Sequence, residues 1–286
     1  MANQMTTNHV RSTSLPTATH PLILSAEEQL RRLKSSEGTS TSSNSTICQK
    51  LDGLRKLYNR VDDVLKLPIS QQVHEKHVKL LEQVSDVSLN VLDTCNIIKD
   101  AFSQIKESVK LLESSLRRGR SGESNLSIQV DAYMASNKKL NKVICKCLRD
   151  LKQKENNQTI IIEDSDFASL ISLIKGVEDI SLTVLESTLS FISHPNMRSK
   201  SSSWCLVKML KPKRVSCEGI DISEVEKIHM ELVLLRNEKI DQSQMLSALK
   251  KLQAFESSIQ ELEDGLGVIF RLLLKNRVSL LNILSH

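Results

Sequence analysis

The chain has 286 residues, with 39 Lys and Arg against 34 Asp and Glu, so its formal net charge is +5. It contains eight Gly, five Pro and 3% aromatic residues, whereas average usage would give about 20 Gly and about 14 Pro. Turn residues are therefore too scarce for a β-sandwich, barrel or propeller, and the Gly-marked turns of a doubly wound α/β enzyme are missing. The 40% hydrophobic content suits a core of Leu, Ile and Val between packed helices.

The N-terminal region, residues 1–45, is predicted to be a disordered tail that contains one short helix. Ser25-Ala-Glu-Glu28 forms a capping box, which predicts a helix at 25–36. The following GTSTSSNS sequence, residues 38–45, is typical of a flexible linker. An organelle transit peptide is the alternative for the first residues, but Arg11 is their only Lys or Arg, so a tail is favoured.

Five further helical regions are predicted from apolar residues that recur every three or four positions. The second of them would be on the order of 70 Å long. Gly265 and Gly267 are candidate bends in the last region. In chain order, the predicted regions are 47–65, 71–118, 126–151, 167–193 and 221–284.

The sustained spacing near 3.5 residues favours helices that pack antiparallel within one chain. We therefore predict an all-α fold, an elongated antiparallel bundle of about four to six long helices with coiled-coil-like packing. Residues 46–286 would form this single bundle domain, interrupted by an irregular basic connection at 194–219. Because no repeat of 20–50 residues is visible, a solenoid is disfavoured.

Charge is segregated along the chain. Residues 117–154 hold ten bases and three acids, 155–195 one base and seven acids, 196–217 six bases and no acid, and 218–264 five bases and eleven acids. Neighbouring helices of opposite sign attract each other when they pack antiparallel. Since an exposed ion pair contributes about 0–1 kcal/mol, we expect these charges to select register more than to stabilise the fold.

Candidates for catalysis or metal binding are few. His74 and His77 are three residues apart and could face one metal ion from a helix, but no third ligand is suggested and a packed histidine is favoured. Cys145 and Cys147 point in different directions on a helix, and the six scattered cysteines are typical of reduced thiols in an intracellular protein. The sequence has no metalloprotease, dinucleotide-binding, P-loop or nucleophile-elbow motif. We therefore predict no catalytic, cofactor-binding or metal-binding residues and no enzymatic activity.

The most distinctive segment is Met197–Cys217, which places six bases beside an apolar cluster and the only tryptophan. Such stretches bind anionic lipid, each base near the surface contributing about 1 kcal/mol. The favoured alternative is a loop that packs Trp204 on the bundle and leaves its bases solvated. Nucleic acid is disfavoured, because aromatic residues for stacking are missing. The candidate lipid or partner contacts are Arg198, Lys200, Trp204, Lys208, Lys211, Lys213 and Arg214, and the candidate phosphorylation sites, which would cancel the attraction, are Ser199, Ser201, Ser202 and Ser203.

The nearly apolar stretch at residues 265–284 has about the length of a membrane span. Three bases lie near its centre, where each costs about 2.5–3.5 kcal/mol in the hydrocarbon, and two asparagines add to that cost. We therefore expect a buried helix whose charges line one face. The polar residues concerned are Arg271, Lys275, Asn276, Arg277 and Asn282.

Three strings in the sequence resemble a plant-specific family. They are RSTSLPTATHPL at residues 11–22, ICQKLDGLRKLY at 47–58, which continues through VDDVLKLP, and RVSLLNIL at 277–284. On these strings, together with Leu116-Arg-Arg118, the chain resembles the BYPASS-like proteins over nearly its whole length. The resemblance implies an intracellular land-plant protein associated with root and shoot development. It implies no established activity, cofactor or catalytic residue.

Two functions are consistent with these patterns. The leading hypothesis is a non-enzymatic helical interaction or scaffold protein with an unidentified protein partner, and self-association is one form that such binding would take. The alternative is a peripheral membrane adaptor that binds anionic lipid through residues 197–217. The expected compartment is the cytoplasm, with the chloroplast and the membrane periphery as alternatives.

Overall fold

The computed structural model describes residues 20–36, 43–71, 78–119, 126–153, 165–193, 224–237 and 242–285. Every regular element within these ranges is a helix, so the predicted all-α class is confirmed. The helices are α1 (Pro21–Ser35), α2 (Asn44–Leu65), α3 (Pro68–Gln71), α4 (Val78–Gly119), α5 (Leu126–Gln153), α6 (Ser165–Ile192), α8 (Glu224–Asn237) and α9 (Gln242–Leu284).

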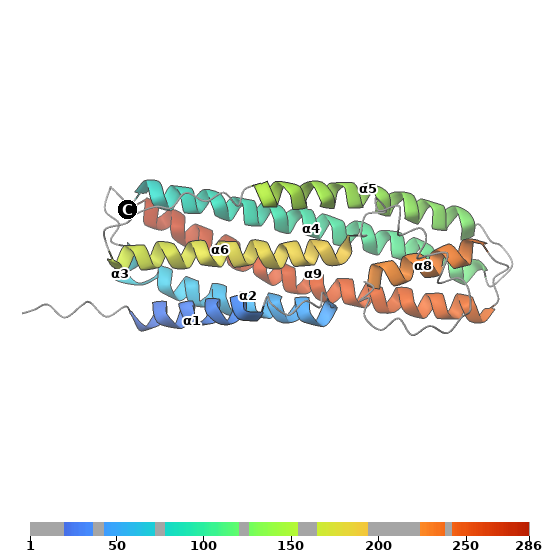
Figure 1. Ribbon diagram of the computed structural model, residues 1–286, viewed down its shortest axis with the longest axis horizontal. Coiled ribbons are helices and arrows are strands. Elements are labelled where there is room, and N and C mark those ends of the chain that lie inside the picture. The colour runs from blue at the N-terminus through green and yellow to red at the C-terminus, as the bar shows by residue number, and fades with distance from the viewer. Residues whose placement is uncertain are drawn as a thin grey trace, which may run out of the picture.

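The long helices lie side by side along one axis and form the predicted elongated bundle (Figure 1). Helices α4 and α9 contain 42 and 43 residues, and at 1.5 Å per residue each is about 65 Å long. They run antiparallel, because Lys106 and Lys110 of α4 pair with Glu263 and Glu256 of α9, respectively.

Helices α4 and α9 are shared by two four-helix arrangements. At one end of the bundle, neighbouring helices contact each other in the order α2, α9, α4 and α6, and α6 closes the arrangement on α2. At the other end the order is α4, α9, α8 and α5, and α5 closes the arrangement by contacting α4. We call these the α2–α6 ring and the α5–α8 ring.

One continuous apolar core fills both rings, and the predicted stripes face it. Its bulkiest fully buried side chains include Phe102 of α4, Phe191 of α6 and Phe255 of α9. The spacing of three and four residues is what turns each stripe toward the core. In α2 every predicted stripe residue is at most 3% exposed, namely Ile47, Leu51, Leu54, Tyr58, Val61 and Leu65.

Helix α1 begins at Pro21, four residues before the expected start at Ser25. His20 provides the N-cap, because its Nδ1 accepts a hydrogen bond of 3.2 Å from the Leu22 N–H. Pro21 suits the first helical position, where its missing N–H leaves no donor unsatisfied. Ser25 lies within the helix instead, and its carbonyl accepts a hydrogen bond of 2.9 Å from Arg60 of α2.

Two glycines allow α1 to approach the bundle closely. A Cβ atom on Gly53 of α2 would lie 2.7 Å from Leu33 Cδ1, and one on Gly176 of α6 would lie 2.7 Å from Leu30 Cδ2. Both distances are shorter than real Cβ contacts. The helical glycines Gly53 and Gly176 therefore form sockets for the two leucines of α1.

The last predicted helical region is two helices, not one. Helix α8 ends at Asn237, α9 begins at Gln242, and the two helices pack against each other. Their contact includes an ion pair of 2.6 Å between Glu231 and Lys251. The prediction of one continuous helical region at 221–284 was wrong, because no Gly or Pro marks the boundary between α8 and α9 in the sequence.

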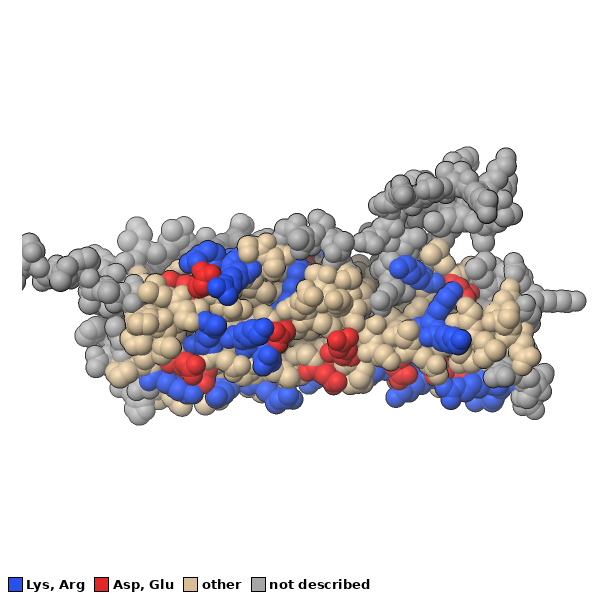
Figure 2. Space-filling model, turned by 90° about the horizontal axis from the view of Figure 1, so that it is seen from below, with Lys and Arg blue, Asp and Glu red and all other residues tan. Residues whose placement is uncertain are grey.

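Several ion pairs join neighbouring helices, as the segregated charge predicted. Lys152 of the basic helix α5 lies 3.4 Å from Glu186 of the acidic helix α6. On the face seen in Figure 2, basic and acidic side chains are interspersed over the described surface. Along α9, however, the charges do not share one face as expected, because Lys275 reaches Asp62 of α2 and Arg277 reaches Ser88 of α4.

Candidate functional site

The segment that the sequence singles out lies outside the described residues. Helix α6 ends at Ile192 and α8 begins at Glu224, and residues 194–223 are not described. The roles assigned to the bases, to Trp204 and to the serines of residues 197–217 therefore stay predictions. His74 and His77 also lie outside the described ranges.

The described residues contain a polar layer inside the α2–α6 ring, to which four helices contribute. The Tyr58 hydroxyl lies 2.7 Å from Ser181 Oγ, and Ser181 donates to the Val177 carbonyl at 2.6 Å. Since the serine proton is used in this way, Tyr58 donates to Ser181. Asn276 of α9 donates to the Tyr58 carbonyl at 3.2 Å. The layer thereby connects α2, α6 and α9 through hydrogen bonds.

Glu178 of α6 is the most unusual member of this layer. It is 3% exposed, and neither carboxyl oxygen has a hydrogen-bond partner among the described residues. Its pKa is raised to about 9, mainly by burial and also by the charge of Asp179, while Lys175 opposes the shift. The carboxyl group therefore keeps its proton at neutral pH, which avoids an unpaired charge in the core.

The other titratable groups of the layer are also neutral. Burial raises the pKa of Tyr58 far above its ordinary value, although the hydrogen bond with Ser181 opposes the shift. Burial likewise raises the pKa of the Cys95 thiol to about 12, with Lys99 opposing. A thiol with this pKa is not a nucleophile at neutral pH. The layer is thus suited to fixing the register of α2, α6 and α9 and not to acid–base or covalent chemistry.

A second polar cluster lies at the contact between α2 and α9. Asp62 is 3% exposed, and its carboxylate lies 2.5 Å from Lys66 and 2.9 Å from Lys275. Burial alone would raise the pKa of Asp62, but hydrogen bonds from the two lysines lower it below its ordinary value. Lys275 joins this buried carboxylate from another helix, so the cluster connects α9 to α2.

We expect Lys275→Met to lower the free energy of unfolding by about 1 kcal/mol at pH 6, because Asp62 keeps only Lys66 as a partner. A carboxyl whose pKa is lowered on folding stabilises the fold above its unfolded pKa and loses that contribution as pH falls below it. The difference from the wild type should therefore shrink below pH 3.8. Urea unfolding between pH 2 and 7 measures it.

The matched control is Lys56→Met, which removes an exposed ion pair of 2.7 Å with Asp52 on the same helix α2. Its effect should stay within about 0.5 kcal/mol at every pH. A Lys275→Met variant that behaves like this control would show that the cluster does not stabilise the contact of α9 with α2.

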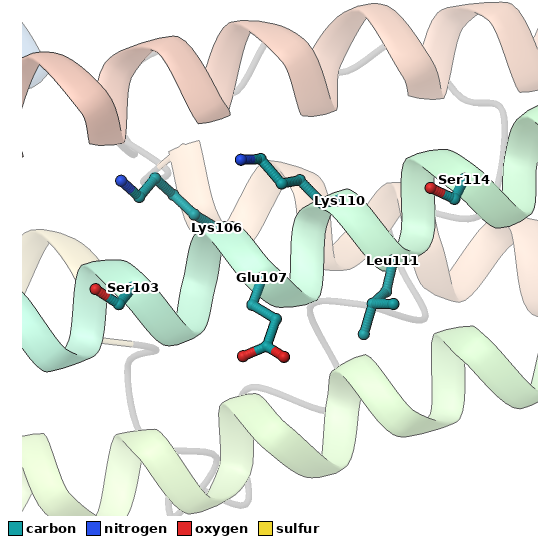
Figure 3. A pocket seen from close by; sticks show the side chains of 6 residues that line it. All are labelled: Ser103, Lys106, Glu107, Lys110, Leu111 and Ser114. Atoms are coloured by element: carbon teal, nitrogen blue, oxygen red, sulfur yellow. The ribbon is translucent and has the colours of Figure 1, made fainter.

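One surface depression of about 350 Å³ lies along α4 (Figure 3). Lys106 and Lys110 point to its α9 side, while Glu107 and Leu111 point to its α5 side. Both lysines already pair with carboxylates of α9. The depression is shallow and lined from one helix, so it does not enclose a small molecule. Its lining residues are Ser103, Lys106, Glu107, Lys110, Leu111 and Ser114.

The described residues contain neither a metal site nor a membrane-spanning helix. Among the described residues, no three His, Cys, Asp or Glu side chains are placed to hold one metal ion. No described helix combines the length and the apolar character that a membrane crossing requires. Within the described part of the chain, Cys48, Cys95, Cys145 and Cys147 form no disulfide bond.

A match to a known protein family shows to which family the chain belongs. A model described as Protein BPS1 matches residues 50–283. The chain belongs to the BPS1 family. This finding confirms the predicted resemblance to BYPASS-like proteins. No curated protein and no solved structure matches the chain.

The BPS1 match includes the helices of both rings, apart from the first residues of α2 and the last residue of α9. It also includes Glu178 and Asp62, which the sequence reasoning missed. For Glu178 a signal was available, because α6 buries apolar residues on most of its circumference and Glu178 is an acid within that pattern. Helix α1 lies before the matched region.

Proposed function

We propose that this BPS1-family chain is a non-enzymatic interaction or scaffold protein that acts in plant root and shoot development. The observation that carries the proposal is an exposed apolar stripe on α9. Leu274, Val278 and Leu281 are 41%, 56% and 43% exposed, and their spacing of four and three residues places them on one side of the helix. We call these three residues the α9 stripe. Apolar residues at this spacing are typical of surfaces that bind partner proteins.

Two further observations support this proposal. The polar layer and the Asp62 cluster hold their groups in neutral or paired states, so their chemistry is that of helix contacts. The assignment to plant development rests on the resemblance to BYPASS-like proteins and on the BPS1 match.

Affinity capture from root and shoot extracts with quantitative mass spectrometry tests the proposal. We expect the triple variant Leu274→Ser, Val278→Ser and Leu281→Ser to lose partners that the full chain retains. The control is Ile128→Ser with Val143→Ser on α5, whose side chains are 63% and 53% exposed. Equal capture by the stripe variant, or no protein enriched above a bait-free control, would contradict the proposal. Light scattering distinguishes a second copy of the chain from another protein.

A second candidate function is a peripheral membrane adaptor that binds anionic lipid. It is favoured by the composition of residues 196–217, which include six bases, no acid and the only tryptophan. The described helices α6 and α8 flank residues 194–223, so the bundle would hold this segment at both ends. Each base near an anionic surface contributes about 1 kcal/mol.

Flotation with vesicles of phosphatidylcholine and phosphatidylserine tests this second function. The full chain should float with them, and a variant with the six bases changed to Gln should not. Changing the exposed bases Lys138, Lys139 and Lys142 of α5 to Gln is the control. The fluorescence of Trp204 should shift to shorter wavelength on binding. Flotation that the six changes leave intact would overturn the lipid hypothesis.

A further inference from the structure

The seam between α2 and α6 is covered by α1, which contacts both helices. The apolar face of α1 points into the seam, and the charged residues Arg31 and Arg32 stay exposed. Leu33 and Leu30 enter the sockets that Gly53 and Gly176 provide. The buried residues of α1 are Ile23, Ala26, Leu30 and Leu33, at positions 1, 4, 8 and 11 of a helical pattern.

The α2–α6 ring closes through contacts among its own four helices, and α1 packs on its outside. Helix α1 therefore covers a groove that the BPS1-family part of the chain builds, whereas α1 itself lies before the matched region. Gly53 of α2 and Gly176 of α6 admit Leu33 and Leu30, which lie about one helical turn apart on α1, so the groove matches the apolar face of a helix.

Helix α1 is held on this groove mainly by apolar contacts. Glu28 forms its ion pairs with Arg31 and Arg32 of α1 itself. Polar contacts with the ring come from Arg60, which donates to Ser25, and from Gln29, which donates to the Gly53 carbonyl at 3.5 Å. A helix of 15 residues is marginal in water on its own. The helical structure of α1 therefore depends on its packing in the groove.

We propose that the α2–α6 seam is a helix-binding groove, that α1 occupies it as an intramolecular plug, and that an amphipathic helix of a protein partner displaces α1. The partner helix carries large apolar residues at positions 1, 8 and 11, a small residue at position 4 and charged residues on its outer face. This pattern is the one that the groove accepts from α1. The inference rests on the proposed function, for which it names a partner class and a means of regulation.

A labelled peptide of residues 21–35 is the probe, and its binding to the full chain is measured by fluorescence anisotropy. The wild type should bind it weakly, because α1 competes at high effective concentration. The variant Leu30→Asp with Leu33→Asp should expel its own α1 and bind the peptide at least tenfold more tightly. The matched control is Leu22→Asp with Leu24→Asp, two residues that are 39% and 51% exposed on the same helix. It should bind as weakly as the wild type.

Filling the sockets provides the second arm. Gly53→Met with Gly176→Met, added to the expelled-α1 variant, should abolish peptide binding while the circular dichroism of the bundle is retained. Hydrogen exchange on the wild-type chain provides a third arm that does not depend on any variant. Saturating unlabelled peptide should lower the protection of the α1 amides and leave that of α2 and α6 unchanged.

Unchanged α1 protection at saturating peptide would overturn the proposal, as would tight peptide binding that survives filled sockets. These results are separable from a failure of the proposed function. If the α9 stripe is needed for capture and the peptide has no effect on α1, the proposed interaction function is supported and the helix-binding groove is contradicted. If the peptide displaces α1 and the stripe variant captures every partner, binding through the α9 stripe is contradicted and the helix-binding groove is supported.

Discussion

Glu178→Gln is expected to remove most of the pH dependence of stability between pH 5 and 9. In the folded protein this carboxyl has a pKa of about 9, against an ordinary value of 4.5. Between these values the folded chain holds a proton that the unfolded chain has lost, so wild-type stability falls as pH rises. The loss is about 1.4 kcal/mol per pH unit. The variant, which has no group to ionise there, should gain on the wild type by about that amount per unit.

Urea unfolding followed by circular dichroism at pH 5, 6, 7 and 8 measures this effect. The control is Glu82→Gln, which neutralises an exposed acid on α4 and should change stability by less than about 0.5 kcal/mol at each pH. Parallel pH profiles of the wild type and Glu178→Gln would contradict the assignment of a buried, protonated carboxyl. Because Gln is close in size to Glu, a change in packing does not explain a slope that differs only with pH.

Phe102→Ala is expected to lower the free energy of unfolding by about 3–5 kcal/mol, because it leaves a cavity in a core that cannot fully collapse around it. Phe102 is 0% exposed and lies near the middle of α4, the helix that both rings use. A loss of this size is a large fraction of the stability of an ordinary domain.

The matched control is Leu111→Ala on the same helix, whose side chain is 55% exposed. It should cost less than about 0.5 kcal/mol. Chemical unfolding with an unchanged denaturant slope would show that Phe102→Ala acts on stability and not on the extent of folding. Equal losses for the two variants would contradict the burial of Phe102 between the helices.

The sequence predicted most of the fold because apolar residues recur every three or four positions along the long helices. The stripe of α2, from Ile47 to Leu65, is buried as its spacing indicated. Elements without such a signal were less predictable. The break between α8 and α9 has no Gly or Pro, and the start of α1 depends on a His20 cap that a stronger Ser25 capping pattern obscured.

The polar sites were less predictable than the fold, since they depend on contacts between distant residues. Tyr58 and Asn276 are 218 residues apart and are joined by a hydrogen bond that no local pattern encodes. Gly53 and Gly176 lie inside helices, and only the packing shows that α1 is the element they admit. The distinctive segment at 197–217 lies outside the described residues, so the sequence remains the source of its predicted role.

The sharing of α4 and α9 by both rings has a consequence for synthesis on the ribosome. Helix α2 starts at residue 44 and its neighbour α9 starts at residue 242. At about 5–20 residues per second, α9 emerges roughly 10–40 s after α2. Until then both rings lack helix α9, and the exposed apolar faces of α2 and α4 can bind chaperones or aggregate. Codon changes that slow translation before residue 242 should therefore lower the yield of folded chain without altering its sequence.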